Sequence, residues 1–160
     1  MKRIIKISNS PDETFQIAKE IAQEVNAPYL IGLSGELGTG KTVFAKGFAE
    51  GLKVKELVTS PTFLGVSESY SGRFPFIHMD FYKKVISKKD IKTYLGKKSI
   101  VLIEWCENYS YVYDDLLNLD TSVYIQYVKD NDKNILENVR QIIIERVTEV
   151  RGVILDESVN

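Results

Sequence analysis

One short stretch of the sequence has the residue types and spacing that bind a phosphate group. Glycines allow backbone conformations that other residues rarely adopt, so successive N–H groups can point at phosphate oxygens. A lysine at the end of the stretch would reach the β- and γ-phosphates, and the hydroxyl after it would ligate Mg²⁺. The stretch follows the pattern G-x-x-x-x-G-K-[ST] and consists of Gly35, Glu36, Leu37, Gly38, Thr39, Gly40, Lys41 and Thr42.

Two carboxylates that end separate apolar runs could complete a hydrolytic site beside this loop. Glu104 follows the aliphatic run Ile100–Ile103, which is typical of a buried strand ending in a Walker B acid that holds Mg²⁺. Asp80 follows the run Phe74–Met79 and could act as a base or position a water molecule. His78 is the single histidine, and it is more typical of a packing residue than of a catalyst.

The segments on either side of the loop predict an α/β fold. Tyr29–Leu33 is a short apolar run typical of a buried strand. Val43–Leu52 carries aromatic or aliphatic residues at every fourth position, which indicates a helix. The loop is therefore predicted to be a strand-to-helix turn, where the first turn of the helix adds unpaired N–H donors to the phosphate site.

A β-hairpin is predicted between the loop helix and the strand that ends at Glu104. Residues 64–70 alternate in polarity, and Ser71-Gly72 then forms a turn before the run Phe74–Met79. Because proline cannot donate a ladder hydrogen bond, Pro75 places its strand at a sheet edge or lies at the beginning of that strand.

The other segments predict a mixed central sheet flanked by helices. Ser10 begins a capping box, S-P-D-E, for a helix that runs to about Val25. Residues 135–139 are ambiguous. Strands are predicted at Lys2–Ile7, Val123–Val128 and Gln141–Val147.

Composition restricts the class of protein. The chain has 160 residues, a length that predicts one domain at residues 1–150 followed by a polar tail at 151–160. Its net charge of −1 gives no drive toward non-specific nucleic-acid binding. One cysteine and one histidine exclude an internal disulfide and a zinc cluster. The first eight residues lack the core of a signal peptide, and no apolar run reaches the length of a membrane span, so we expect a cytoplasmic protein with no membrane association.

Two polar segments have more than one interpretation. Thr59–Phe63, T-S-P-T-F, reads alone as an ordinary turn, but after a phosphate-binding loop it is placed where nucleotide-sensing switch segments lie. Lys83–Lys98 contains seven lysines and one acid, which is more typical of a solvated face than of a docking edge for RNA or an acidic partner.

Four motifs in order resemble one bacterial ATPase family. They are L-S-G-E-L-G-T-G-K-T at 33–42, T-S-P-T-F at 59–63, H-M-D-F-Y at 78–82 and L-I-E-W at 102–105. Together they resemble TsaE, also called YjeE, which is required for the N6-threonylcarbamoyl modification of adenosine 37 in tRNAs reading ANN codons. The resemblance implies a single-domain P-loop NTPase fold over most of the chain.

The resemblance also implies roles for individual residues. Lys41 and the loop amides would bind the phosphates of ATP, Thr42 and Glu104 would hold Mg²⁺, and Asp80 would position or activate the hydrolytic water. The other implied nucleotide contacts are Thr62 near the γ-phosphate or Mg²⁺, Trp105 near the nucleotide and the partner surface, Thr14 toward the base, and Arg140 at the start of the last strand. The family's D-L-Y-R-L is D-F-Y-K-K here, so the planar fork of arginine is lost at Lys83.

The implied partners are the TsaB and TsaD proteins, with tRNA reached only through their complex. TsaE would not transfer the threonylcarbamoyl group; its ATP hydrolysis would support repeated turnover by that complex. We see no arginine finger, so the isolated enzyme is expected to be slow. Alternatives are an ATP-dependent assembly switch without essential hydrolysis, and a small-molecule P-loop kinase, although the lid-length lysine segment contains no arginine. A GTPase is disfavoured because the N/T-K-x-D motif is missing.

Overall fold

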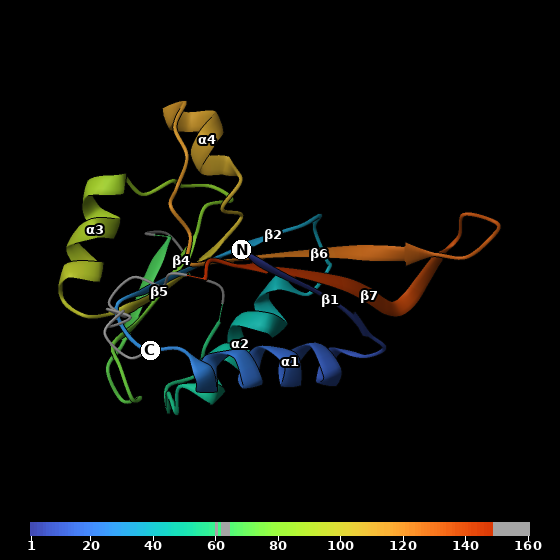
Figure 1. Cartoon of the computed structure of the whole chain (residues 1–160), viewed down its shortest axis with the longest axis horizontal. Helices are drawn as coiled ribbons and strands as arrows, with labels where there is room; N and C mark the ends of the chain where they lie inside the picture. Colours follow the sequence, from blue (N-terminus) through green and yellow to red (C-terminus); the bar gives the residue numbers. More distant parts are fainter. Residues whose placement is uncertain (60, 62–64, 149–160) are drawn as a thin grey trace, which may run out of the picture.

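One mixed sheet organises the chain in the computed structural model, which describes residues 1–59, 61 and 65–148. The described residues form seven strands and four helices (Figure 1). In chain order these are β1 (Lys2–Ser8), α1 (Pro11–Glu24), β2 (Tyr29–Ser34), α2 (Lys41–Gly51), β3 (Val66–Ser69), β4 (Phe76–Asp80), α3 (Lys88–Gly96), β5 (Ile100–Glu104), α4 (Asn108–Tyr113), β6 (Thr121–Lys129) and β7 (Ile135–Arg146). The predicted tail at 151–160 lies outside the described residues.

The sheet combines a parallel centre with antiparallel edges. Its strand order is β1-β7-β6-β2-β5-β4-β3. Strand β2 is parallel to β5 and to β6, and β5 is parallel to β4, whereas β1–β7, β6–β7 and β3–β4 are antiparallel pairs. The carboxyl ends of β2, β5 and β4 therefore meet at the same edge of the sheet, where the glycine-rich loop that follows β2 begins.

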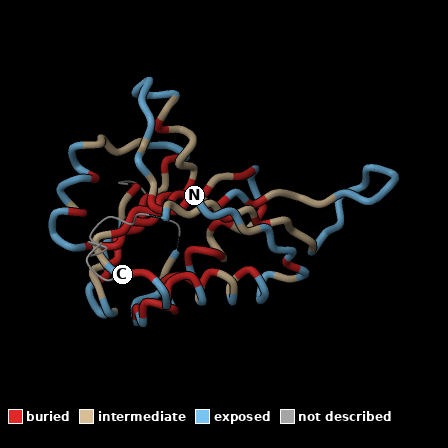
Figure 2. The backbone as a smooth tube through the Cα atoms, viewed as in Figure 1, coloured by how far each residue is buried: buried red, intermediate tan, exposed pale blue. Residues whose placement is uncertain are grey.

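Helices cover both faces of the sheet centre. α1 and α2 pack on one face, together with the inward side chains of β2, β5, β6 and β7. α3 and the start of α4 pack on the other face against β2, β4 and β5. The two helical layers lie on opposite sides of the strands in Figure 1, and the middle of the sheet, around β2, β5 and β4, is largely buried in Figure 2. No described helix is long and apolar enough to cross a membrane.

The predicted elements agree with the structure in type, and the differences lie at their ends. Ser10 caps α1 as predicted, because its Oγ accepts from the Glu13 N–H at 3.1 Å while Glu13 Oε2 accepts from the Asn9 N–H at 2.7 Å. The helix α2 begins at Lys41 rather than Val43. The ambiguous residues 135–139 belong to β7.

The predicted hairpin is present as β3 and β4, with Ser69 opposite Phe76. Strand β4 lies between β5 and β3, so it is not an edge strand; Pro75 immediately precedes it instead. The Pro75 carbonyl accepts from the Ile100 N–H at 2.9 Å. Because Pro75 lies before the first residue of β4, its missing N–H removes no hydrogen bond between β4 and its neighbouring strands. Residue 64, where the prediction began the hairpin, lies outside the described residues.

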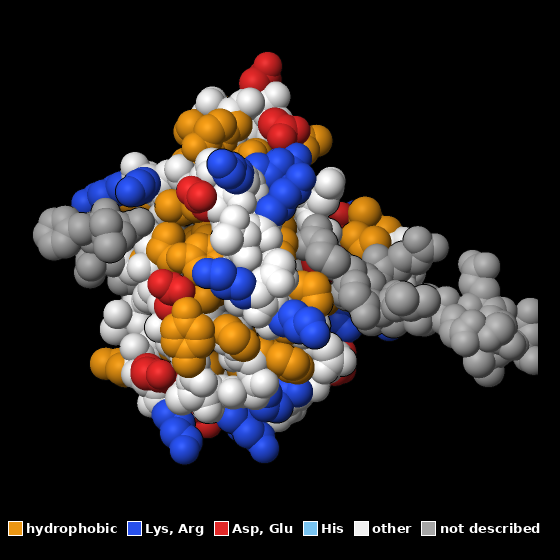
Figure 3. Space-filling model, turned by 90° about the vertical axis from the view of Figure 1, so that its left-hand side faces the viewer, with side chains coloured by type: hydrophobic (Ala, Val, Ile, Leu, Met, Phe, Trp, Pro, Cys, Tyr) orange, Lys and Arg blue, Asp and Glu red, His pale blue; other side chains and the backbone are white. Residues whose placement is uncertain are grey.

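The lysine-rich segment contains the helix α3, whose lysines lie on an exposed surface. Lys88 Nζ is paired with Asp115 Oδ2 at 2.9 Å, while Ile91 and Leu95 are buried against the sheet. On the face shown in Figure 3, basic side chains alternate with apolar and acidic ones and form no continuous patch. This arrangement agrees with the interpretation as a solvated face.

Two glycines let α1 and α2 approach each other closely. A Cβ built on Gly47 would lie 2.2 Å from the carbonyl oxygen of Phe15, and one on Gly51 would lie 2.4 Å from the carbonyl oxygen of Lys19. Both contacts are with backbone atoms, which cannot rotate away. The close approach fixes α2, and with it the loop that α2 begins, against the first helix.

We expect Gly47→Ala to destabilise the protein despite the better helix propensity of alanine. Overpacking of a backbone contact should lower the free energy of unfolding by about 1–3 kcal/mol. Gly96→Ala is the matched control, because nothing lies within 4 Å of its Cβ position; we expect it to be neutral or to stabilise by up to about 1 kcal/mol. Urea unfolding of the two variants measures both effects, and equal midpoints would contradict the packing argument.

Candidate functional site

The glycine-rich loop of residues 35–40, between β2 and α2, depends on left-handed backbone conformations. Gly35, Gly38 and Gly40 have φ angles of 141°, 80° and 110°. A Cβ on Gly35 would also lie 2.2 Å from the carbonyl oxygen of Ile125 in β6, so a side chain is excluded there by contact as well as by conformation. Gly40 is the N-cap residue of α2, which places the open N–H groups of that helix at the loop.

Lys41 is held inside the loop by carbonyl oxygens. Its Nζ donates to the Gly35 carbonyl at 2.6 Å and to the Glu36 carbonyl at 2.8 Å, and it lies 4.1 Å from the centroid of the Trp105 ring. Burial lowers the pKa of Lys41, while the carboxylates of Glu107, Glu104 and Asp80 oppose this shift. The loop carbonyls and the nearby carboxylates therefore offset only part of the cost of burying the charge of Lys41.

A chain of side chains joins α2, β5 and β4 at the sheet edge. Thr42 Oγ1 donates to Glu104 Oε1 at 3.0 Å, and Glu104 Oε2 lies 2.6 Å from His78 Nε2. Glu104 is opposite Asp80 in the parallel register of β4 and β5. The two carboxylates consequently share one face of the sheet, next to the first residues of α2.

Asp80 is half-buried and held by its own backbone turn. Its Oδ1 accepts from the Tyr82 N–H at 2.9 Å. Burial raises the pKa of Asp80, and the Glu104 carboxylate adds to this rise, whereas the Tyr82 N–H, His78 and Lys41 oppose it. A carboxylate with a raised pKa is a better proton acceptor at neutral pH than an exposed one.

Lys41, Thr42, Asp80 and Glu104 line one cavity of about 290 Å³. Hydroxyl and carboxylate oxygens, a lysine and the start of a helix converge there, a combination suited to a phosphate chain with a hard cation. The described residues contain no cluster of three or more acidic, histidine or cysteine side chains that could hold a metal alone. The cavity is lined by Leu37, Gly38, Gly40, Lys41, Thr42, Val43, Asp80, Tyr82, Glu104 and Trp105.

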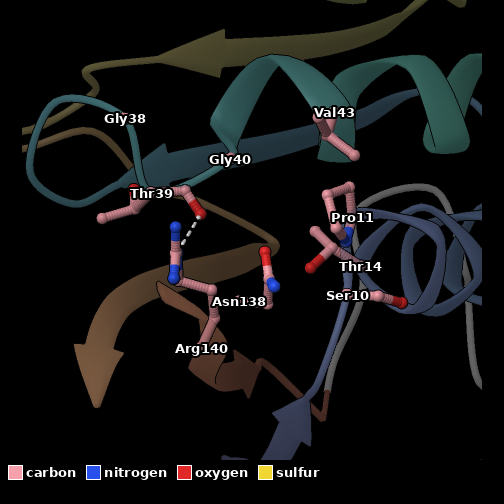
Figure 4. A pocket seen from close by; sticks show the side chains of 9 residues that line it. All are labelled: Ser10, Pro11, Thr14, Gly38, Thr39, Gly40, Val43, Asn138 and Arg140. Carbon is pink, nitrogen blue, oxygen red and sulfur yellow. Dashed lines mark hydrogen bonds between the residues drawn. The ribbon is translucent and has the colours of Figure 1, made fainter. Parts of the chain in front are cut away.

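A second cavity, of about 120 Å³, lies on the other side of the loop (Figure 4). It has an apolar lining with a few polar groups, which suits the flat ring of a base. Three residues of α1's first turn and cap form one wall, and the amide of Asn138 points into the space between Arg140 and Thr14. The lining residues are Ser10, Pro11, Thr14, Gly38, Thr39, Gly40, Val43, Asn138 and Arg140.

Thr14 and Arg140 reach the second cavity in different ways. The Thr14 hydroxyl is 2.7 Å from Ser8 Oγ, so its methyl group is what faces the loop, 3.9 Å from the Cβ position of Gly40. Arg140 Nε donates to the Thr39 carbonyl at 3.1 Å, and the guanidinium lies 4.6 Å from the Tyr127 ring centroid. Arg140 therefore holds the loop itself.

The structure brings most of the predicted site residues to these two cavities; Gly35 and Glu36 line neither, and their carbonyls bond Lys41 instead. Lys41, Thr42, Asp80, Glu104 and Trp105 line the first, and Thr14, Thr39 and Arg140 line the second. Gly38, Gly40 and Val43 line both, so a ligand could pass over the loop from one to the other. The predicted contact Thr62 and most of the predicted switch segment lie outside the described residues.

The sequence reasoning missed several site residues and one contact. It treated His78 as a packing residue, whereas the buried ring is bonded to Glu104. Tyr82 was quoted only as the last residue of the motif H-M-D-F-Y, and Asn138 was not singled out. Glu107, one turn beyond Glu104, was not singled out.

Glu107 contributes a further, half-buried carboxylate that interacts with Lys41. Burial raises the pKa of its carboxyl, and Lys41 and the Gly35 N–H oppose the rise. Its Oε1 has no hydrogen-bond partner among the described residues. The neighbouring Cys106 is not activated, because burial raises the pKa of its thiol to about 12.

The seven-stranded mixed sheet and the four helices that the described residues form, with a glycine-rich loop between a central parallel strand and a helix, define a mixed α/β protein. The family model described as "Threonylcarbamoyl adenosine biosynthesis protein TsaE" matches residues 8–139. The chain belongs to the TsaE family of tRNA threonylcarbamoyladenosine biosynthesis proteins.

Individual relatives agree with this assignment. The TsaE protein of Bacillus subtilis is 38% identical over 107 residues, which are 66% of this chain and 68% of that protein. The TsaE protein of Treponema pallidum is 30% identical over 135 residues, covering 81% of this chain and 96% of that protein. The crystal structure of Bacillus subtilis YdiB matches with a TM-score of 0.73 and 29% identity over 91% of this chain and 86% of that one. The expected family and the expected α/β fold are both confirmed.

We expect Asp80→Asn to gain stability relative to the wild type as pH rises. The folded-state pKa of Asp80 lies above its ordinary value of 3.8. Between these two pKa values the folded protein binds more protons than the unfolded chain, so the contribution of Asp80 to the free energy of unfolding falls as pH increases. Asparagine does not titrate and can still accept from the Tyr82 N–H. Urea unfolding at several pH values from below 3.8 to 7 should show a widening difference in favour of the variant; a difference that stays constant or shrinks would contradict it.

Proposed function

We propose that this protein binds and hydrolyses ATP with Mg²⁺ in support of threonylcarbamoyl transfer to tRNA by other proteins. In this proposal it acts on a TsaB–TsaD complex and does not transfer the group itself. The observation that carries the proposal is the convergence of Lys41, Thr42, Glu104 and Asp80 on one cavity beside the start of α2. Phosphate binding, metal binding and water activation each have a candidate residue within it.

Nucleotide phosphates would replace the loop carbonyls as the partners of Lys41. The lysine bonds the Gly35 and Glu36 carbonyls at 2.6 and 2.8 Å, and a triphosphate is a stronger acceptor because it is charged. The loop N–H groups and the first turn of α2 would add neutral donors. The apolar second cavity would take the base, with the Asn138 amide able to donate and accept hydrogen bonds.

The residues present fit a magnesium ion. Thr42 Oγ1 and Glu104 Oε1 are 3.0 Å apart and are hard oxygen ligands, and in such sites the substrate phosphates and water supply the remaining ligands. When bound, Mg²⁺ neutralises charge that develops on the phosphates. Thr42 and Glu104 would hold it beside the lysine.

Asp80 would orient the attacking water and accept its proton. The Tyr82 N–H fixes one carboxylate oxygen, and the raised pKa makes the group a more effective base. The γ-phosphoryl group would be transferred to water. A kinase lid usually supplies arginines that hold a small acceptor, whereas the segment Lys83–Lys98 contains lysines and no arginine. Thr59–Phe63, most of which lies outside the described residues, remains the candidate segment for reporting the nucleotide state to partners.

We expect Asp80→Asn to abolish ATP hydrolysis while leaving ATP binding close to normal. Loss of a positioned base should lower the rate about 10²–10⁴-fold, whereas the phosphate-binding groups are untouched. Trp105 is the only tryptophan and lies beside Lys41, so its fluorescence follows binding in both proteins. If the variant hydrolyses ATP normally, Asp80 is not the base. If it fails to hydrolyse yet sustains the full modification cycle, the protein is an assembly switch.

We expect hydrolysis to be specific for ATP and to be stimulated by partners. None of the described arginines lines the cavity of Lys41, so the isolated protein should release phosphate slowly, and TsaB with TsaD should raise the rate. Phosphate release measured from ATP and from GTP, with and without the two partners, tests this directly. Equal rates with and without the partners would contradict the proposed place in the complex.

A further inference from the structure

We propose that His78 is a positioning residue that holds Glu104 in the orientation needed to bind Mg²⁺ together with Thr42. The inference rests on the proposed function and deepens it. The side chains of His78 and Glu104 are 1% and 3% exposed, and His78 Nε2 is 2.6 Å from Glu104 Oε2. They come from the neighbouring strands β4 and β5, which run parallel.

The two oxygens of Glu104 have different partners, and this difference fixes the carboxylate plane. Oε1 accepts from the Thr42 hydroxyl at 3.0 Å, and Oε2 is held by His78. The terminal torsion of a glutamate is broad and has no strong preference of its own. Without His78, Oε2 would be buried with no partner there, and the plane would be free to turn away from Thr42.

The surroundings of His78 show that its polarity serves Glu104. A carboxylate that binds Mg²⁺ is ionised and can only accept, so Nε2 must carry the hydrogen of the bond. The ring is stacked on Phe76 with centroids 6.1 Å apart, and Nδ1 has no partner among the described residues. Its neighbours Ile77 and Met79 are apolar and fully buried. An apolar residue would avoid the cost of the unpartnered Nδ1, so packing alone does not explain a histidine here.

The same bond also bears on the distance between Glu104 and Asp80, the proposed base. Asp80 follows His78 by two residues and so lies on the same face of β4, opposite Glu104 in the register. The His78–Glu104 bond joins β4 to β5 two residues before Asp80. It therefore limits how far Asp80 and Glu104 can separate. Removing a side chain that orients a metal ligand typically lowers the affinity for the metal 10- to 100-fold.

Two substitutions and one control separate positioning from general stability. His78→Met removes the donor but keeps an adaptable side chain of similar length, and His78→Gln retains a donor at the same distance from the backbone. Ile77→Ala empties a buried site on the other face of the same strand. ADP binding is followed by Trp105 fluorescence in EDTA and over a range of Mg²⁺ concentrations, with thermal unfolding recorded for each protein.

We expect all the proteins to bind ADP similarly in EDTA. His78→Met should need about tenfold or more Mg²⁺ for the same effect on ADP binding, with His78→Gln within about threefold of the wild type. Ile77→Ala should lower the melting temperature without changing the Mg²⁺ requirement. An unchanged requirement in His78→Met, or an equal change in Ile77→Ala, would overturn this inference alone. No Mg²⁺-dependent binding in the wild type would overturn the proposed function as well.

A measurement on the unsubstituted protein decides the matter even if His78→Met does not fold. His78 is the only histidine, so ¹⁵N-histidine labelling gives one imidazole in the NMR spectrum. We expect the proton to lie on Nε2 in slow exchange with water, and its shift to move when Mg²⁺ is added to the ADP complex but not when ADP is added in EDTA. A proton on Nδ1 alone, or no response to Mg²⁺, would overturn the inference.

Discussion

The buried carboxylate of Glu104 is the group on which the arrangement of the site depends. A charge removed from water is stable only when hydrogen-bond donors surround it, and here the donors come from two other elements of the fold. Thr42 approaches from the start of α2 and His78 from β4, while Glu104 ends β5. One ionised group thus connects a helix and two strands, and their relative positions cannot change without exposing or orphaning it.

The charges near Glu104 are balanced at some cost to the folded state. Burial lowers the pKa of Lys41 and raises the pKa values of Asp80 and Glu107. The charged form of each group is therefore less stable in the folded protein than it would be in water. One lysine faces three acids in a small space. An arrangement of this kind is typical of sites built for a ligand, because a bound divalent cation would balance the carboxylates that the single lysine does not.

The sequence predicted the parts of the site that depend on local pattern. The loop residues 35–42 and the strand-end acids Asp80 and Glu104 were found because glycine spacing and apolar runs carry that information. The partner of His78 could not be predicted, since the bond depends on which strand lies beside β4, and a histidine in an apolar run fits packing equally well. Residues 135–139 were ambiguous because that part of β7 is largely exposed and lacks a buried alternation. Pro75 allowed two positions, and only the strand order distinguishes them.

The hairpin of β6 and β7 gives the loop its shape from a distant part of the chain. A loop that turns its N–H groups toward a phosphate must turn its carbonyls away, and those carbonyls need donors of their own. Tyr127 Oη donates to the Leu37 carbonyl at 2.6 Å, and Arg140 Nε donates to the Thr39 carbonyl at 3.1 Å. The Gly35 and Glu36 carbonyls instead bond Lys41, the group that a phosphate would claim. Ligand binding would therefore exchange the lysine contacts while the hairpin contacts stay, so the loop can keep its conformation and little ordering cost falls on the ligand.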